Sequence, residues 1–388
     1  MNDVRTTNGQ SVPVWYRALA ASDREALTER WSAPWPDRPV DTVVIGAGIA
    51  GLSTAYHLLR QGCSVVLLEM NSIGSGETGR TSAHLACAVD DRYHELERIH
   101  GVAHAAWIAQ SHQAAISSIE SICSSEAIAC EFERVNGYLI AADRADEKEL
   151  AREVAPARRA GLSVRWREAG PSPFDGAAAL CFTDQAQFQP LAYVLGLART
   201  VRRLGGRIYT RTKMRRIEHG DTLRVHVDGQ LPLSAGSVVV ATNTPVNDRI
   251  AMHTKQASYR SYVLGIDVPA GSVERALYWD TLDPYHYVRL AGDDLLIVGG
   301  EDHKVGQSGE PSASWTRLEA WVRERFRGAG ELRFRWSGQI QEPDDGVAFI
   351  GKAPGHSPVY IATGDSGNGL THGALAGLLL SDLIVGRD

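Results

Sequence analysis

Hydrophobic and polar positions along the chain follow two different patterns. In the first, a short apolar run over Thr42–Ile45 leads into a glycine-rich turn, a helical repeat over Leu52–Gln61 and a second apolar run over Ser64–Leu68. Continuous runs of this length are typical of strands buried on both faces of a parallel sheet. The pattern returns late in the chain, where an expected strand over Val359–Thr363 precedes an expected helix over Leu370–Ile384.

From Tyr259 to about Ile340 the second pattern takes over, with apolar and polar residues alternating along successive strands. Such alternation predicts an antiparallel sheet inserted into the parallel one. One helix, Ser314–Arg325, interrupts these strands, which are expected at 259–268, 285–290, 295–299 and 332–340. Other helices are expected at about 21–29, 90–125 with a break at Gly101, 146–160 and 191–204, and other strands at 132–134, 138–141, 207–210, 223–227 and 237–242.

Composition narrows the class of protein. The 388 residues include 40 Lys or Arg and 46 Asp or Glu, a net charge of −6, so no nucleic-acid partner or anionic membrane surface is indicated. The 5 cysteines form no C-x-x-C or C-x-H pair, which argues against a metal site or a disulfide framework. No apolar run reaches the ~18 residues of a membrane span, and residues 1–10 lack a signal-peptide core. We therefore expect a soluble, cytoplasmic protein without a bound metal.

The first glycine-rich turn has the spacing of a dinucleotide cradle. Gly46 permits the tight turn, Gly48 lets the backbone approach a pyrophosphate, and Gly51 lets the helix pack closely on the strand. The amides at the start of the helix and its positive dipole end favour a phosphate. Glu69 ends the next strand, where a carboxylate accepts hydrogen bonds from a ribose diol. The expected cofactor contacts here are Gly46, Gly48, Ile49, Ala50, Gly51 and Glu69.

A second glycine-rich turn, Gly364–Gly373, separates the last expected strand from the last expected helix. Small residues there let a helix N-terminus approach a ligand that becomes anionic, as a reduced flavin does. No second G-x-G-x-x-G with its own strand and acid is present, so reducing equivalents would come directly from an organic substrate. This favours FAD over NAD. The expected contacts in this turn are Gly364, Gly367, Asn368, Gly369, Leu370 and Thr371.

Together these patterns predict an α/β fold in which a Rossmann-like FAD-binding domain is interleaved with a mostly antiparallel substrate-binding sheet domain. Residues 1–39 form an N-terminal arm with a short helix, which Trp15 and Tyr16 help to dock. The FAD-binding domain takes 40–90, 185–250 and 340–388, and the substrate-binding domain takes 91–184 and 251–339.

From Thr42 to Leu383 the chain resembles the D-amino-acid-oxidase-like superfamily of FAD-dependent amine oxidoreductases, which includes glycine oxidase and sarcosine oxidase, and within it the γ-glutamylputrescine-oxidase-like branch. The matching residues are Ile73–Arg80, Ala241–Asn243, Trp336–Gly338, Asp345-Gly346 with Ile350-Gly351, and Gly364–Gly373.

The resemblance implies further cofactor contacts from the loop that wraps the flavin and from neighbouring strands: Gly79, Arg80, Thr81, Ser82, Met214, Ala241 and Thr242. The chain departs from the branch at Thr81–His84, where relatives often have an Asn-Gly-Gly run. Many relatives also resemble fusions with a Rieske domain, whose C-x-H…C-x-x-H ligands this sequence lacks. Any such electron path is therefore expected to lie in another protein.

Candidate residues on the substrate side come from Tyr285–Arg289, where strand alternation places Tyr285, Tyr287 and Arg289 on one face. By resemblance this strand faces the flavin, and Arg289 would clamp a substrate carboxylate. The alternative is that Arg289 pairs with a structural acid and the tyrosines pack in the core. His84 is a candidate base or flavin attachment point, against the alternative of a structural histidine. Lys255 and the turn Glu301–Lys304 are more simply explained as solvated.

These observations lead to one functional hypothesis. An amine or amino acid, bound in its neutral form, would lose a hydride from its α-carbon to flavin N5, giving an imine that hydrolyses. Oxygen or a separate electron acceptor would reoxidise the flavin. Three alternatives remain open: oxidation of an alcohol or hydroxy acid, a dehydrogenase that passes electrons to a Rieske or quinone partner, and a non-catalytic flavin-binding subunit.

Overall fold

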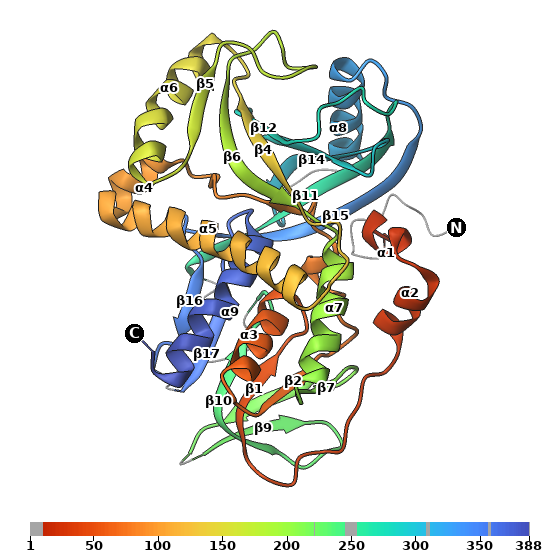
Figure 1. The fold of residues 1–388 in the computed structure, drawn as a ribbon, viewed down its shortest axis with the longest axis vertical. Coiled ribbons are helices and arrows are strands. Elements are labelled where there is room, and N and C mark those ends of the chain that lie inside the picture. Colours follow the sequence, from red (N-terminus) through yellow and green to blue (C-terminus); the bar gives the residue numbers. More distant parts are fainter. Residues whose placement is uncertain (1–10, 221, 245–253, 308–310, 356–357, 388) are drawn as a thin grey trace.

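Two β-sheets form the framework of the protein, one above the other in Figure 1. The computed structural model describes residues 11–220, 222–244, 254–307, 311–355 and 358–387. The polar segment 1–10 lies outside these described residues. Within the described parts, one sheet has eight strands and the other has nine.

The eight-stranded sheet has a parallel centre. Its hydrogen-bonded order is β16-β17-β10-β1-β2-β7, with β9 pairing to β10 and β8 to β9. Parallel pairing joins β17, β10, β1, β2 and β7 in turn. The strands are β1 (Val40–Ile45), β2 (Val65–Leu68), β7 (Arg207–Tyr209), β8 (Met214–Glu218), β9 (Leu223–Val227), β10 (Leu233–Val240), β16 (Phe349–Lys352) and β17 (Val359–Thr363).

Continuous apolar runs fold into these central strands because both faces of each strand are covered. All four residues of β2 and all five of β17 are buried, as are Val43 and Val44 of β1. Burial on both faces explains the absence of alternation in their sequences. β17 joins the sheet beside β10, so a late segment of the chain completes a sheet that begins at Val40.

The nine-stranded sheet is antiparallel except where β12 pairs with β4. Its order is β15-β11-β14-β13-β12-β4-β6-β3, and β5 pairs with β6. The strands are β3 (His84–Leu85), β4 (Glu133–Ile140), β5 (Val164–Arg167), β6 (Ala179–Gln187), β11 (Gln256–Asp267), β12 (Leu277–Asp280), β13 (His286–Ala291), β14 (Leu295–Lys304) and β15 (Leu332–Pro343).

A β-bulge interrupts the pairing of β11 with β14. Arg260 pairs with His303 and Tyr262 with Gly300, so Glu301 and Asp302 together stand opposite Ser261. Glu301 adopts a φ of 58°, a left-handed conformation that is uncommon for a residue with a side chain. A bulge of this kind re-aims the side chains of its strand. The segment expected to be a solvated turn is therefore a bent strand, in which Glu301 is buried against Arg317.

Helices cover both sheets (Figure 1). They are α1 (Val14–Ala18), α2 (Ala21–Thr28), α3 (Ile49–Arg60), α4 (Tyr93–His100), α5 (Val102–Ser125), α6 (Arg144–Arg159), α7 (Pro190–Arg203), α8 (Pro311–Arg325) and α9 (Gly369–Val385), with a 3-10 turn η1 (Glu77–Gly79).

Two glycines let α3 and α9 pack in close contact. A Cβ atom on Gly373 would lie 2.5 Å from Cγ2 of Ile49, and one on Gly377 would lie 2.6 Å from Cβ of Ser53. These positions are one helical turn apart, so one face of α9 lies directly on α3. The first turns of both helices are thereby brought to the same place.

The N-terminal arm is more deeply packed than the sequence suggested. Besides α2, close to the expected helix at 21–29, it contains α1. Trp15 and Trp31 are 2% and 4% exposed, and the indole of Trp15 donates a hydrogen bond to the carbonyl of Thr81 at 2.6 Å. From residue 11 onward, where it is described, the arm therefore contributes to the hydrophobic core.

The mixed α/β fold class is confirmed, and most expected elements are present within a few residues. The two strands expected at 132–134 and 138–141 are the single strand β4. The nine-stranded sheet extends to Gln187 and Pro343, slightly past the proposed domain limits, which themselves stay a prediction.

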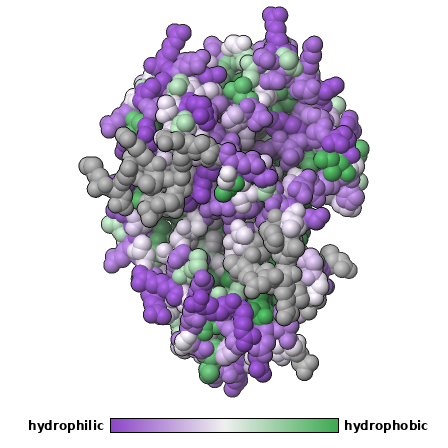
Figure 2. Space-filling model, turned by 180° about the vertical axis from the view of Figure 1, so that it is seen from behind, coloured by the Kyte–Doolittle hydropathy of each residue, from purple (hydrophilic) through white to green (hydrophobic). Residues whose placement is uncertain are grey.

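In the described parts of the chain, every helix is too short or too polar to cross a bilayer. Seen from behind, the surface is mainly hydrophilic with small separate apolar areas (Figure 2).

Candidate cofactor and active site

A cavity of about 620 Å³ is lined by residues of both sheets and by the first turns of α3 and α9. Most of the residues expected from the sequence lie in its wall. They are Gly46, Gly48, Ile49, Ala50, Glu69, Arg80, Thr81, Ser82, His84, Met214, Ala241, Thr242, Tyr285, Tyr287, Gly367, Asn368, Gly369 and Leu370.

Glycine is required at the cradle because no side chain would fit. Gly46 has a φ of 109°, and a Cβ atom there would lie 2.3 Å from the carbonyl oxygen of Ala241. A Cβ atom on Gly51 would lie 1.9 Å from the carbonyl oxygen of Gly46. Gly51 is not in the cavity wall, so its role is to pack the helix on the strand, whereas Gly48 faces the ligand space.

The N-termini of α3 and α9 both open onto the cavity. Gly48 caps α3 and Asn368 caps α9, and neither residue caps its helix with a side-chain hydrogen bond. The amide of Ile49 donates to Oγ1 of Thr78 at 3.1 Å. Two positive helix ends facing one cavity favour a ligand with more than one anionic or electron-rich group.

Two backbone amides hold the carboxylate of Glu69 in the cavity wall. Its Oε2 accepts from the amide of Ala47 at 2.8 Å and its Oε1 from the amide of Asn71 at 2.7 Å. Each carboxylate oxygen retains acceptor capacity for a diol. Lys213 and Arg215 line the same cavity and follow Thr212, whose amide bonds to the carbonyl of Glu69. A ribose diol and a pyrophosphate therefore both find suitable partners, and the residues present fit FAD.

The loop after η1 is fixed from outside the cavity. The guanidinium of Arg80 donates to the carbonyl of Ser337 at 2.6 Å and to Oγ of Ser11 at 2.8 Å. Indole groups of Trp15 and Trp336 donate to the carbonyls of Thr81 and Arg80. Gly79 lies outside the cavity wall, beneath this loop. Arg80 thus holds the loop in place while Thr81 and Ser82 line the cavity.

Two tyrosines form the wall contributed by β13 and the residue before it. The hydroxyl of Tyr287 lies 2.7 Å from Oγ of Ser261, and that of Tyr285 donates to Oδ2 of Asp90 at 3.3 Å. Their ring centroids are 5.8 Å apart. Burial raises the pKa of both hydroxyls, so both remain protonated. The two tyrosine rings supply a flat, weakly polar part of the wall, with the carboxyl of Asp90 beside it.

His84 lines the cavity, but both of its ring nitrogens are engaged. Nε2 lies 3.2 Å from the carbonyl of Val288, which requires a donor, so Nδ1 accepts from Oγ of Ser82 at 2.9 Å. Burial and then the charge of Arg289 lower its pKa to about 3. His84 is therefore neutral with an assigned tautomer, which supports the structural alternative.

The structure does not bring Arg289 to the cavity, although it shares a strand face with Tyr287. Its Nη1 donates to the carbonyls of Ala83 at 2.7 Å and Phe188 at 3.1 Å, and Nε to the carbonyl of Leu290 at 3.0 Å. Burial lowers the pKa of the guanidinium to about 9. Since its donors are used on backbone carbonyls, we assign Arg289 a structural role.

Gly364 and Thr371 also lie outside the cavity wall, as do Gly51, Gly79 and Arg289. Gly364 has a φ of 74° in the turn after β17, and Thr371 is fully buried behind that turn. The exposed Lys255 is likewise absent from the wall.

Several residues of the cavity wall were not expected from the sequence, notably Thr78, Asp90, Lys213, Arg215, Ser261 and Asp365. Thr78 and Asp365 belong to motifs that were recognised, and Lys213 and Arg215 flank Met214, so a signal existed for these. Asp90 and Ser261 belong to no motif, and only the fold brings them to the cavity.

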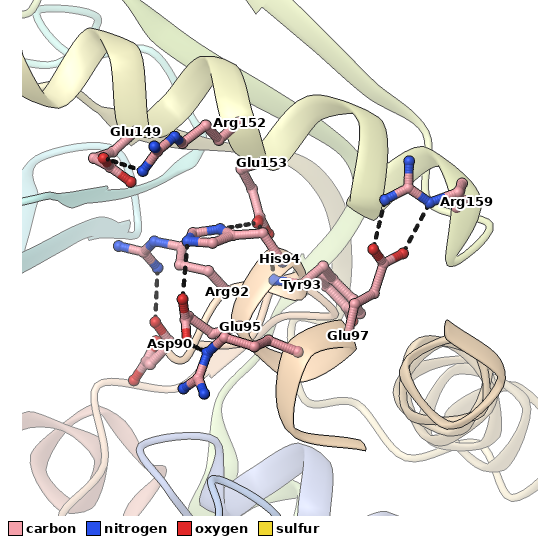
Figure 3. A network of polar contacts seen from close by, with 11 residues as sticks. Asp90, Arg92, Tyr93, His94, Glu95, Glu97, Glu149, Arg152, Glu153 and Arg159 are labelled. Atoms are coloured by element: carbon pink, nitrogen blue, oxygen red, sulfur yellow. Dashed lines mark hydrogen bonds and ion pairs between the residues drawn. The ribbon is translucent and has the colours of Figure 1, made fainter. Parts of the chain in front are cut away.

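Asp90 is positioned by the start of α4. Buried Glu153 of α6 accepts from the amides of Tyr93 and His94, and so caps α4 (Figure 3). Arg92 donates to the carbonyl of Asp90 at 3.0 Å. Asp90 lines the cavity, and desolvation by the surrounding protein, with a smaller contribution from the charge of Asp91, raises its pKa to about 6. Its carboxyl lies in the cavity wall, where the hydroxyl of Tyr285 donates to it.

A histidine pair ties α5 to the first turn of α9. Nδ1 of His372 lies 2.8 Å from the carbonyl of Asp365, so this nitrogen carries the hydrogen. Nε2 of His372 then accepts from Nε2 of His112 at 2.8 Å. Burial lowers the pKa of His372 to about 4, which keeps it neutral. The pair orients the helix end that faces the cavity.

Comparison with known proteins agrees with this geometry. The family described as FAD dependent oxidoreductase matches residues 41–383. A putative Rieske 2Fe-2S iron–sulfur protein of Bacillus subtilis is 30% identical over 353 residues, which cover 90% of this chain and 69% of that protein. Gamma-glutamylputrescine oxidoreductase of Escherichia coli is 25% identical over 89% of this chain and 84% of its own length.

Among solved structures, glycine oxidase from Geobacillus kaustophilus superposes with a TM-score of 0.77, at 16% identity, over 90% of this chain and 95% of that one. The family expected from the motifs is thus confirmed. The chain belongs to the FAD dependent oxidoreductase family, and its glycine cradle, Glu69 and paired helix ends are the parts that fit the cofactor.

Proposed function

We propose that this protein oxidises a carbon–nitrogen bond of a small-molecule amine, with FAD held in the cavity described above. The observation that carries the proposal is the division of the cavity. One part has the cradle, Glu69 and basic residues suited to a dinucleotide, and the other has Tyr285 and Tyr287 with Asp90 beside them. The names of the relatives support this, because two of them are called glycine oxidase and gamma-glutamylputrescine oxidoreductase.

The chain's own residues would bind and orient rather than exchange protons. When bound, FAD supplies a hydride acceptor for the carbon next to the substrate nitrogen. The first turn of α3 faces the pyrophosphate and Glu69 the ribose, while the positive end of α9 stabilises negative charge that develops in the cavity. Both nitrogens of His84 are engaged, so the amine is expected to react in its neutral form.

An anaerobic visible spectrum of the purified protein tests the proposal, recorded before and after addition of polyamines and N-alkyl amino acids. Bleaching of the oxidised flavin band by amines is the expected result. Bleaching by alcohols or hydroxy acids alone would overturn the proposal, as would a stable flavin that nothing reduces. The second outcome would favour a non-catalytic flavin subunit.

Replacing Gly48 tests the cradle separately. A Cβ atom there would lie 2.9 Å from Oγ1 of Thr78, and the rest of a leucine would occupy the ligand space. The Gly48→Leu variant is expected to lose its flavin colour. Unchanged yellow protein would contradict the assignment of the cradle.

A second candidate concerns the electron acceptor. The relative named for a Rieske group favours transfer to an iron–sulfur partner over transfer to oxygen. Mixing the substrate-reduced protein with air-saturated buffer separates the two, since an oxidase reoxidises at once and a dehydrogenase slowly. The cytoplasmic location expected from the sequence remains a prediction.

A further inference from the structure

Among the residues that the structure describes, the substrate side of the cavity has an acidic side chain but no lysine or arginine. The nine-stranded sheet and the segment from 84 to 90 contribute His84, Ala86, Ala88, Asp90 and residues of β11, β12, β13 and β15 to the wall, with Tyr285 beside them. Among these described residues there is no lysine or arginine, and the only carboxylate is that of Asp90. Arg289, the expected carboxylate partner, is bound to the carbonyls of Ala83 and Phe188.

Two more carboxyl groups lie behind Asp90 and Tyr285. The bulge in β14 turns Asp302 toward Ser261, which hydrogen-bonds to it and lines the cavity. Oδ1 of Asp302 is buried without a hydrogen-bond partner in the described structure. Glu342 of β15 accepts from Oγ of Ser366 at 2.9 Å and interacts electrostatically with Asp90. Neither Asp302 nor Glu342 lines the cavity, so both would act on a ligand through Asp90 and Ser261 rather than by direct contact.

Asp90 repels the ionised forms of both Asp302 and Glu342. Burial raises the pKa of Asp302 to about 7 and that of Glu342 to about 8, and the negative charge of Asp90 adds to both shifts. The other charged groups facing Asp90 are Asp91 and Arg92, and Arg92 donates to the backbone carbonyl. A positive ligand would allow the carboxyls to ionise together.

That positive charge is best placed on a nitrogen that does not react. A carboxylate beside the reacting ammonium would stabilise its protonated form, whereas hydride transfer requires the neutral amine. The carboxyl cluster of Asp90, Asp302 and Glu342 therefore suits a second nitrogen of the same substrate.

We propose that Asp90, supported by Asp302 and Glu342, binds a second, non-reacting ammonium, so that the substrates are diamines or polyamines rather than amines that carry a carboxylate. This inference rests on the proposed function. It names the substrate class of the same cavity and the residue that selects it.

Three amines of similar length that differ in the remote group provide the test: putrescine, butylamine and γ-aminobutyrate. The rate of anaerobic flavin bleaching is measured at several concentrations of each. Since a charge-assisted hydrogen bond corresponds to about 10- to 100-fold in affinity, kcat/KM for putrescine should exceed that for butylamine by about this factor, with γ-aminobutyrate slowest. Asp90→Asn should reduce the putrescine-to-butylamine ratio at least about 10-fold. Asp175→Asn, an exposed carboxylate in another loop, should leave the ratio unchanged.

Proton release gives a readout that is independent of turnover. Putrescine is titrated calorimetrically into dithionite-reduced holoenzyme, which cannot oxidise it, in two buffers of different ionisation enthalpy. Binding should release protons near neutral pH because the cation promotes ionisation of the cluster, and Asp90→Asn or Asp302→Asn should release fewer. If Asp90→Asn does not fold, Asp302→Asn serves in both experiments.

The outcomes separate the two proposals. If no amine bleaches the flavin, the proposed function fails. If amines bleach it but the three rates are similar, or γ-aminobutyrate is fastest, the second-ammonium site is overturned while amine oxidation stands. An unchanged ratio in both variants, or binding without proton release, would also overturn it.

Discussion

Replacing Arg289 by methionine tests whether this arginine supports the fold or binds a substrate. Methionine keeps an unbranched apolar chain of similar length but removes every donor. The carbonyls of Ala83 and Phe188 are in fully buried residues, and each would lose the guanidinium that now lies within 3.1 Å. The ring of Trp15, 5.2 Å from the guanidinium carbon, would lose a cation–π contact.

The expected loss of stability follows from these contacts. A hydrogen bond from a charged donor contributes about 1.5–3 kcal/mol to stability. The desolvation cost of burying the guanidinium offsets part of the stabilisation from its two bonds to Ala83 and Phe188. The net cost of Arg289→Met should be about 2–4 kcal/mol. For a chain of 388 residues the unfolding entropy is about 0.8 kcal/mol/K, so Tm should fall by about 3–5 °C.

Thermal unfolding in excess FAD measures this loss, with Arg165→Met, an exposed arginine of β5 in the same sheet, as the matched control. KM for the amine substrate should change less than about 3-fold, because Arg289 is not in the cavity wall and its Nε and Nη1 donate to backbone carbonyls. An unchanged Tm combined with a KM raised about 100-fold would refute the structural role and restore the carboxylate clamp.

Three further predictions concern the cradle, the arm and the carboxyl cluster. Gly51→Ala should yield protein without bound flavin, because the added Cβ atom would lie 1.9 Å from a backbone carbonyl oxygen. Gly351→Ala in β16 is the control, since a Cβ atom there meets open space and the protein should stay yellow. Equal flavin absorbance in the two variants would contradict the packing role of Gly51. Trp15→Ala should lower the free energy of unfolding, measured in urea, by about 3–5 kcal/mol, since this side chain is buried and donates to the carbonyl of Thr81. A loss below about 1 kcal/mol would show that the arm is not part of the core. Glu342→Gln should gain stability relative to the wild type as pH rises from about 4.5 to 8. Burial raises the pKa of Glu342 in the folded state to about 8, so the wild type loses stability across that window while glutamine does not titrate; a pH-independent difference in urea midpoint would contradict this.

Local sequence patterns were sufficient for the cradle but not for the substrate side. The roles of Gly46, Gly48 and Gly51 depend on atoms within one strand–turn–helix unit, so their spacing carries the information. Strand alternation correctly places Arg289 on the same face as Tyr287, but it does not say where along that face the cavity ends. Two residues farther along the strand, the side chain reaches backbone carbonyls instead of the cavity.

Other parts of the site arise only from long-range pairing. Asp302 points toward Ser261 because a bulge makes two residues of β14 oppose one of β11, and alternation along β14 alone does not reveal a bulge. His112 and His372 are 260 residues apart in sequence, so no local pattern could join them. The buried Trp15 shows the same limit, because its partner Thr81 belongs to a distant loop.

The pairing of α3 with α9 determines when during its synthesis the protein can hold a cofactor. Gln61, which ends α3, contacts Ser381 of α9 across 320 residues. At about 5–20 residues per second, α3 leaves the ribosome roughly 15–60 s before α9 exists. Throughout that interval the face of α3 around Ile49 and Ser53 is uncovered, open to chaperones and proteases. A nascent chain interrupted before α9 therefore cannot be stabilised by binding flavin. Bound flavin, seen as yellow colour, shows that translation has continued past this helix.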